Sequence, residues 1–88
     1  MANFMIVSPH TSQECLRALD ETLAQGSDVL AKYHFGCKNG DHTAYAMVEA
    51  TSEREARRYV PDFLRSKTRI IQVAQFSPEE IRAAHAQK

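Results

Sequence analysis

Hydrophobic and polar positions alternate along the chain in a pattern that predicts four strands and three helices. Short runs rich in Ile, Val, Phe, Met and Ala predict strands over residues 3–8, 29–36, 42–50 and 69–76. Leu16, Leu19 and Leu23 share one stripe at helical spacing, and a second stripe runs from Ala56 to Leu64. A last helix is expected after the fourth strand.

The pattern S/T-x-x-E marks the expected start of each helix. It occurs at residues 11–14, 52–55 and 77–80, each time between a strand run and a helical pattern. In this capping box the hydroxyl and the carboxylate accept hydrogen bonds from backbone N–H groups that lack a partner at a helix start. Gly26 is expected to end the first helix. Pro61 lies inside the second and predicts a kink or a new start there.

The order of these elements predicts the topology. Strand, helix, two strands, helix and strand, followed by a short C-terminal helix, indicate an α+β fold of the ferredoxin-like βαββαβ type. One domain over residues 1–88 is expected, because the chain is too short for two. Right-handed crossovers place the antiparallel strands in the order four, one, three, two, with the helices on one face. The other face is left open.

Asn39-Gly40 is the favoured central pair of a two-residue hairpin turn, and it places His34 opposite Tyr45. A four-residue loop would instead pair His34 with Thr43. Both registers keep the same side chains on the same face, because side chains alternate with a period of two. The open face is then expected to carry Leu30, Lys32, His34, Thr43, Tyr45, Met47 and Glu49, and the helix side Ala31, Tyr33, Phe35, Ala44, Ala46 and Val48.

The open face mixes apolar, basic, acidic and phenolic side chains, which is typical of a ligand pocket or a semi-polar interface. The first functional hypothesis is therefore a site for a small organic ligand. His34 would serve as acid, base or donor, Tyr45 as donor, Lys32 and Glu49 as charge complements, and Met47 as pocket wall. The alternative is that His34 and Tyr45 line a dimer interface.

The second hypothesis is a metal site at one end of the sheet. His10 follows the first strand, Cys37 and His42 flank the hairpin turn, and Cys15 lies near the start of the first helix. Imidazole and thiolate suit zinc, nickel or copper. No close ligand pair such as C-x-x-C is present, so surface histidines and a core cysteine remain the alternative. A transition metal is the one cofactor candidate.

Charge and sequence motifs argue against nucleic acid as a partner. The formal net charge is zero, whereas nucleic acid and anionic membranes demand a basic face. The RNA-recognition signature, laid on residues 43–50, matches at Tyr45, Ala46 and Val48 but lacks the cation and the further stacking aromatics. The arginine-rich stretch over residues 54–69 is interpreted as a solvated helix face. No nucleophile elbow, phosphate loop or zincin motif is present, so catalytic residues stay unassigned.

Cysteine content and hydropathy predict a cytoplasmic protein that has no membrane partner. Two cysteines are few for a secreted scaffold of this size. The apolar run at residues 4–7 is too short for a signal-peptide core, and no run has membrane-spanning length. Because a domain this small has a thin stability margin, we expect a homodimer that buries the open face.

Several segments resemble the dimeric α+β-barrel superfamily, which contains small monooxygenases, muconolactone-isomerase-like enzymes and stress-responsive barrel proteins. The segments are residues 4–8, 33–42, 60–65 and 76–80. The chain also resembles uncharacterised bacterial single-domain proteins of this type, some relatives of which bind nickel. The resemblance implies two open sheet faces packed together, with a pocket between sheet and helices or inside the barrel. None of these residues is a catalytic signature.

Three functions follow from these observations. The first is a homodimeric α+β-barrel domain that binds a small organic ligand at the open face, including a cofactor-independent enzyme. The second is a transition-metal-binding protein that uses His10, Cys37 and His42. The third is a non-catalytic interaction module, because this fold hosts many functions.

Overall fold

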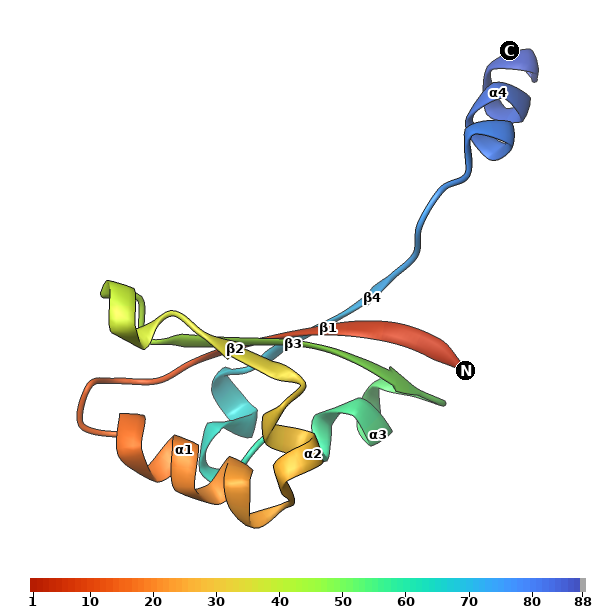
Figure 1. The fold of residues 1–88 in the computed structure, drawn as a ribbon. Coiled ribbons are helices and arrows are strands. Elements are labelled where there is room, and N and C mark those ends of the chain that lie inside the picture. The colour runs from red at the N-terminus through yellow and green to blue at the C-terminus, as the bar shows by residue number, and fades with distance from the viewer. Residues whose placement is uncertain (88) are drawn as a thin grey trace.

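An open four-stranded antiparallel sheet forms the centre of an α+β fold (Figure 1). The computed structural model describes residues 1–87. Its strands are β1 (Ala2–Pro9), β2 (Tyr33–Phe35), β3 (Thr43–Ala50) and β4 (Arg69–Val73). Its α-helices are α1 (Cys15–Ala24), α2 (Ser27–Leu30), α3 (Glu53–Arg57) and α4 (Pro78–Ala86), and its 3-10 helices are η1 (Cys37–Asn39) and η2 (Asp62–Lys67).

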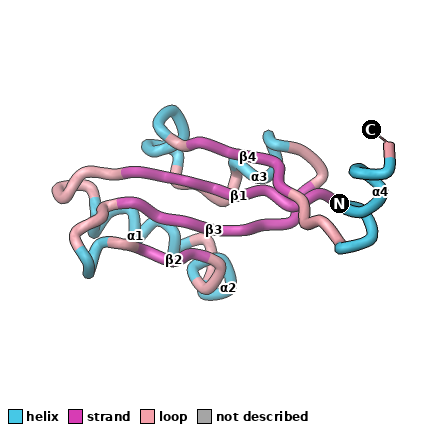
Figure 2. The backbone as a smooth tube through the Cα atoms, turned by 90° about the horizontal axis from the view of Figure 1, so that it is seen from above, coloured by secondary structure: helices cyan, strands magenta, loops and turns pink. Residues whose placement is uncertain are grey.

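The strands lie side by side in the order β2-β3-β1-β4, and each neighbouring pair is antiparallel (Figure 2). Counted from the β4 edge, this is the predicted order four, one, three, two. Helices α1, α2 and α3 cover one face of the sheet, and the other face is open, as expected (Figure 1).

The core lies between the sheet and these helices. Alternate residues of the central strands point into it, since Phe4 and Ile6 of β1 and Val48 of β3 are at most 5% exposed. The small residues Ala44 and Ala46 are also buried there, so the helices approach the sheet closely. From the helix layer, Ala56, Val60 and Leu64 fill the space. The predicted assignment of faces on β3 and the predicted second helical stripe are confirmed.

The predicted second strand is wrong over residues 29–32. Gly26 adopts a φ of 136°, and the next four residues form the single helical turn α2. The N–H of Leu30 donates to the carbonyl of Gly26 at 3.1 Å, and the N–H of Ala31 donates to Ser27 at 3.0 Å. These local bonds replace a strand ladder. Leu30 therefore lies in a helix and not on the open sheet face, and Lys32 lies in the turn before β2.

The hairpin between β2 and β3 has the predicted register, and His34 lies opposite Tyr45. Its turn differs from the prediction, because residues 37–39 form η1 in place of a two-residue turn. The carbonyl of Gly36 accepts hydrogen bonds from the N–H groups of Asn39 at 2.9 Å and Asp41 at 3.0 Å. Only Gly40 of the expected pair has a positive φ, at 87°.

Helix α1 begins later and buries a different face than its leucine stripe predicts. The Thr11 and Glu14 side chains each accept a hydrogen bond from the other's backbone N–H, at 3.2 and 2.9 Å, so the capping pair forms. The helix then starts at residue 15. Its buried residues are Ala18 and Thr22, whereas Leu16 is 69% exposed. The helix packs through its small residues, because these allow the closest approach to the sheet.

The remaining helices follow the sequence signals. The hydroxyl of Ser52 accepts a hydrogen bond from the N–H of Glu55, and α3 ends before Pro61, where η2 begins. A complete capping box between Ser77 and Glu80 starts α4. Strand β4 ends at Val73, three residues earlier than predicted, and α4 stands clear of the sheet on the side away from the other helices (Figure 1). Among residues 1–87, no helix is long and apolar enough to cross a membrane.

Candidate metal site

Four potential metal ligands meet at one end of the sheet. Each of His10, Cys15, Cys37 and His42 offers one ligand atom, and these atoms all lie within 4.8 Å of one another. They come from four places in the chain: the link from β1 to α1, the first residue of α1, the short helix η1, and the residue just before β3. Figure 1 shows the β1–α1 link and η1 at the same end of the molecule. The convergence expected from the topology is thus present.

Backbone contacts hold the four residues in place. The N–H of His10 donates to the carbonyl of His42 at 2.9 Å, which continues the pairing of β1 with β3 beyond the strand ends. Cys37 is the first residue of η1. Cys15 is the first residue of α1, directly after the Thr11–Glu14 capping pair. The ligands are therefore carried by defined backbone structure at every position.

The spacing of the donor atoms is near that of a tetrahedral site. His10 Nε2 lies 3.3 Å from Cys37 Sγ. A tetrahedron with Zn–N of about 2.05 Å and Zn–S of about 2.3 Å has a mixed edge of about 3.5 Å and a sulfur–sulfur edge of about 3.8 Å. The largest separation in the cluster, 4.8 Å, exceeds the longest edge by about 1 Å. Small side-chain rotations would close the cluster around an ion.

Two buried polar atoms in the cluster lack a partner. Nδ1 of His10 and Nδ1 of His42 are shielded from solvent and make no hydrogen bond within residues 1–87. The two rings lie edge to face with their centroids 5.6 Å apart. A buried polar atom without a partner is costly, and buried polar groups that lack a protein partner commonly contact an ion or water. Each imidazole can ligate one ion through only one nitrogen, so an ion held at Nδ1 would satisfy that atom, whereas an ion held at His10 Nε2 beside Cys37 would leave Nδ1 of His10 without a partner.

Protonation in the metal-free protein follows from burial. Burial, followed by the charge of His42, lowers the pKa of His10, so this imidazole is held neutral and able to ligate. Burial and the neighbouring Cys15 raise the pKa of the Cys37 thiol. A bound cation has the opposite effect on a thiol, because it favours the thiolate that coordinates it. Metal binding would therefore release protons from the cysteines.

The residues expected to bind an organic ligand do not form one pocket. His34 and Tyr45 are cross-strand neighbours on the open face. The Tyr45 hydroxyl donates instead to Asp41 Oδ2 at 2.7 Å, and Tyr45 makes no hydrogen bond with the His34 side chain among residues 1–87. Met47 lines a separate hollow of about 450 Å³ on the open face, together with Asn3, Met5, Val73, Ala74 and Gln75. Lys32 and Glu49 are exposed and line none of the hollows described.

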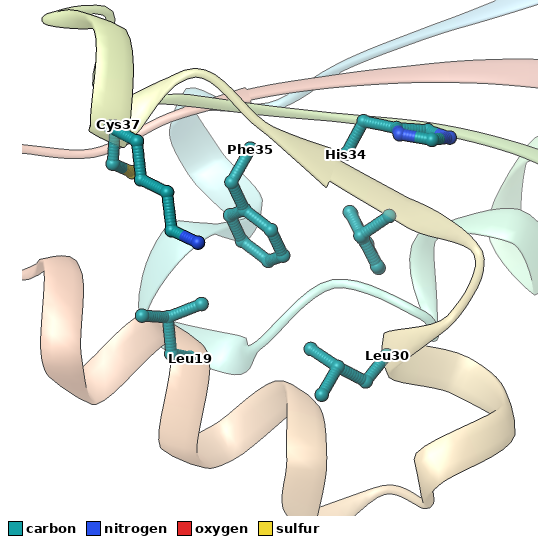
Figure 3. A pocket seen from close by; sticks show the side chains of 7 residues that line it. Leu19, Leu30, His34, Phe35 and Cys37 are labelled. Carbon is teal, nitrogen blue, oxygen red and sulfur yellow. The ribbon is translucent and has the colours of Figure 1, made fainter.

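A different cavity lies on the helix side of β2, between sheet and helices, where the family resemblance implied a pocket without assigning residues to it. It measures about 430 Å³ and is mostly apolar (Figure 3). Leu19 and Leu30 face Phe35 across it, and Cys37 lies at one end. Its full lining is Leu19, Leu30, Tyr33, His34, Phe35, Cys37 and Lys38. The sequence did not predict that Leu30 lines this cavity, because a strand over residues 29–36 would direct the Leu30 side chain to the open face.

The chain matches none of the known protein-family models, curated proteins or solved structures with which it was compared. Its function is therefore argued from its own geometry.

Proposed function

We propose that this protein binds a transition-metal ion, zinc in the first place, through His10, Cys15, Cys37 and His42. The observation that carries the proposal is the meeting of two imidazoles and two thiols within 4.8 Å. The set takes up two of the chain's four histidines and both of its cysteines. Both cysteines are free thiols, so both are available as ligands.

The donor set favours zinc over the other metals. Two nitrogens and two sulfurs in a tetrahedral arrangement are typical of zinc, whereas divalent copper and nickel favour planar nitrogen and oxygen sites. Four protein ligands leave no open position for water or substrate, which is typical of a structural zinc site. The ion would tie the β1–α1 link to η1 and to the start of β3, and so stabilise one end of a small domain.

Zinc titration of the purified protein tests this function. We expect one zinc per chain and, at a free zinc concentration about 100 times the Kd, a rise in Tm of roughly 10–20 °C. Cys37→Ser and His42→Ala each remove one ligand. Loss of an outer-shell partner alone costs about 10–100-fold in affinity, so each substitution should weaken zinc binding by more than about 100-fold.

His34→Ala is the matched control, because His34 lies outside the cluster on an exposed strand position. It should leave zinc stoichiometry and affinity unchanged. Cobalt(II) substitution adds a spectroscopic test, since tetrahedral thiolate coordination gives strong visible absorption. Wild-type protein that takes up no zinc, nickel or copper under reducing conditions would contradict the proposal.

A small organic ligand is the second candidate, and the 430 Å³ cavity favours it. Ligand sites are mostly apolar cavities of about 300–1,000 Å³ with a few polar groups. His34, the residue singled out from the sequence, contributes to the lining of this cavity, although its ring is directed away from Leu19 and Leu30 (Figure 3). A thermal-shift screen of organic acids and aromatic compounds would test it. A hit should weaken in Leu19→Trp, which fills the cavity, and survive in Met47→Ala on the open face.

We also propose that the fold is ferredoxin-like and belongs to a bacterial branch of the dimeric α+β-barrel superfamily. The strand order and the single helix-covered face support this assignment. A homodimer through the open face is supported by its exposed apolar residues Tyr45, Met47 and Ile71. A cytoplasmic location is supported by the free thiols, which a reducing compartment preserves. If neither metal nor organic ligand binds, an interaction module remains.

A further inference from the structure

Four arginines surround one hollow on the helix side of the molecule. Arg54, Arg57 and Arg58 come from α3 and its C-terminal end, and Arg65 comes from η2. These four side chains alone line a hollow of about 220 Å³. One water takes up about 30 Å³ in the liquid, so there is room for a multiatomic anion. Such a concentration of positive charge is unexpected in a chain whose formal net charge is zero.

Two of the arginines are fixed by the backbone. Nη1 of Arg57 donates to the carbonyl oxygens of Arg65 at 2.9 Å and Thr68 at 3.2 Å. Nε of Arg65 donates to the carbonyl of Val60 at 3.0 Å. These carbonyls belong to η2 and the segments that flank it. Because main-chain atoms hold these two guanidinium groups, Arg57 and Arg65 would lose little side-chain freedom when a ligand binds, whereas the exposed Arg54 and Arg58 would become ordered on binding.

The nearby carboxylates neutralise only these two fixed arginines. Glu53 pairs with Arg57 at 3.2 Å, and Asp62 pairs with Arg65. Arg54 and Arg58 form no salt bridge or hydrogen bond through their side chains within residues 1–87. They are four residues apart on one helix, where like charges repel. The hollow therefore holds two uncompensated positive charges beside two fixed guanidinium groups.

We propose that this hollow binds the phosphate group of a small phosphorylated molecule. Guanidinium groups recognise phosphate oxygens through paired N–H donors, and a phosphate would neutralise the charges of Arg54 and Arg58 together. The site is separate from the four proposed metal ligands, none of which lines it. The inference goes beyond metal binding and stands without it.

The surface beside the hollow could bind the part of the ligand that is attached to the phosphate group. Arg58 and Arg65 also line a second hollow of about 400 Å³, so the two hollows adjoin each other at these residues. The second one combines apolar Val60 and Pro61 with Gln25 and with the carboxylates of Glu21 and Asp62, which can accept hydrogen bonds from hydroxyl or amino groups. A phosphate monoester with a polar organic part fits this arrangement. Bare phosphate and pyrophosphate are then the minimal ligands.

Binding of pyrophosphate to the full chain, followed by calorimetry or NMR, tests the inference. We expect saturable binding that weakens at least tenfold in the double variant Arg54→Gln/Arg58→Gln. The matched control Arg82→Gln removes a positive charge from α4, where Arg82 is 74% exposed, and should bind as wild type. The variant Arg54→Lys/Arg58→Lys keeps the charge but loses the paired donors, and it should also bind more weakly.

Three outcomes would overturn the site. They are equal affinity in the wild type and the glutamine double variant, equal weakening in Arg82→Gln, and citrate binding as tightly as pyrophosphate. The last outcome would indicate general anion attraction. Zinc content and circular dichroism of each variant are measured in parallel, so a failure here is distinguishable from a failure of the metal site. Arg54 and Arg58, the two substituted arginines, are both exposed, so the variants should fold normally.

Discussion

At the residue scale, the surroundings of a side chain decide its chemistry. His10 is 5% exposed and has a buried ring nitrogen without a partner, whereas His34 stands exposed on the edge strand β2. The two side chains are chemically identical; strand parity placed His34, and the topology placed His10 at one end of the sheet. Only His10 has a second imidazole and two thiols beside it. Its burial and its neighbours make it a ligand candidate.

The Glu14 carboxylate gives a residue-scale prediction. The hydrogen bond from Lys67 Nζ, 2.7 Å away, and the Thr11 N–H lower the pKa of Glu14 from 4.5 to about 2. Because the folded pKa is depressed, its stabilising effect is complete above about pH 4.5 and is lost as the pH falls towards 2. Lys67→Met should move the pKa of Glu14 upward. An NMR titration of metal-free protein measures the shift.

Lys67→Arg is the control for that titration, because it retains a cation that can reach Glu14. It should keep the pKa of Glu14 well below that of the Lys67→Met variant. A titration midpoint that is identical in wild type and Lys67→Met would show that this contact does not form in solution.

At the element scale, the hairpin turn is the feature that positions two residues of the proposed metal site. Helix η1 replaces a tight two-residue turn and sets Cys37 at its start, with His42 three residues after its end. The turn closes because the Gly36 carbonyl accepts two backbone hydrogen bonds. The register of the strands was predictable from the Asn39-Gly40 pair, but the path of the loop was not. Local hydrogen bonding in η1 competes with the tight turn and prevails here.

Two glycines in this hairpin lead to a matched pair of predictions. A Cβ at Gly36 would lie 2.6 Å from the carbonyl oxygen of Asp41, so the backbone must move. Gly36→Ala should therefore weaken zinc binding by about tenfold or more. A Cβ at Gly40 meets no atom within 4 Å, but the φ of 87° is unfavourable for alanine by about 1–2 kcal/mol. Gly40→Ala should chiefly lower the free energy of unfolding.

Urea unfolding of the metal-free variants and zinc competition with a chelator measure the two effects separately. Gly40→Asn should be milder than Gly40→Ala, because asparagine tolerates the left-handed region. Zinc affinity equal to wild type in Gly36→Ala would show that the turn does not position Cys37.

At the scale of the whole molecule, two apolar surfaces remain uncovered. The open sheet face exposes Met47 to 53% and Ile71 to 37%, and the segment leading into α4 exposes Phe76 to 76%. All of α4 is exposed and stands off the sheet. An isolated helix of nine residues is marginal in water, even with a complete capping box. A second copy packed on this side would cover the sheet face and support α4.

Light scattering coupled to gel filtration tests this dimer. Wild type should elute at twice the chain mass, and Met47→Lys should shift it to the monomer, because a charge would be buried in the interface. Leu16→Lys is the control, since Leu16 is 69% exposed on α1, in the helix layer. A wild-type protein that is monomeric at micromolar concentration would contradict the dimer and would not bear on the proposed zinc site.

Much of the fold could be predicted from the sequence because its signals are local. Capping pairs, Pro61 and strand alternation depend on neighbours within a few residues, and they placed the faces of β3 and the restart of the second helix. The strand order followed from the order of the elements and the right-handed crossover rule. The leucine stripe of α1 failed as a guide, because helix packing through Ala18 and Thr22 was favoured over side-chain hydrophobicity. The predicted length of β2 was wrong because the helical turn α2 satisfies the backbone N–H and carbonyl groups that a longer strand would have paired.

The sequence by itself determined which end of the sheet would collect His10, Cys15, Cys37 and His42, since topology alone brings those chain segments together. The tertiary structure decided that their donor atoms lie within 4.8 Å and that two imidazole nitrogens are buried without partners. It also decided that Leu30 closes a cavity and that four arginines share a hollow. Such features depend on distances between segments far apart in the chain, which packing sets and no local pattern records.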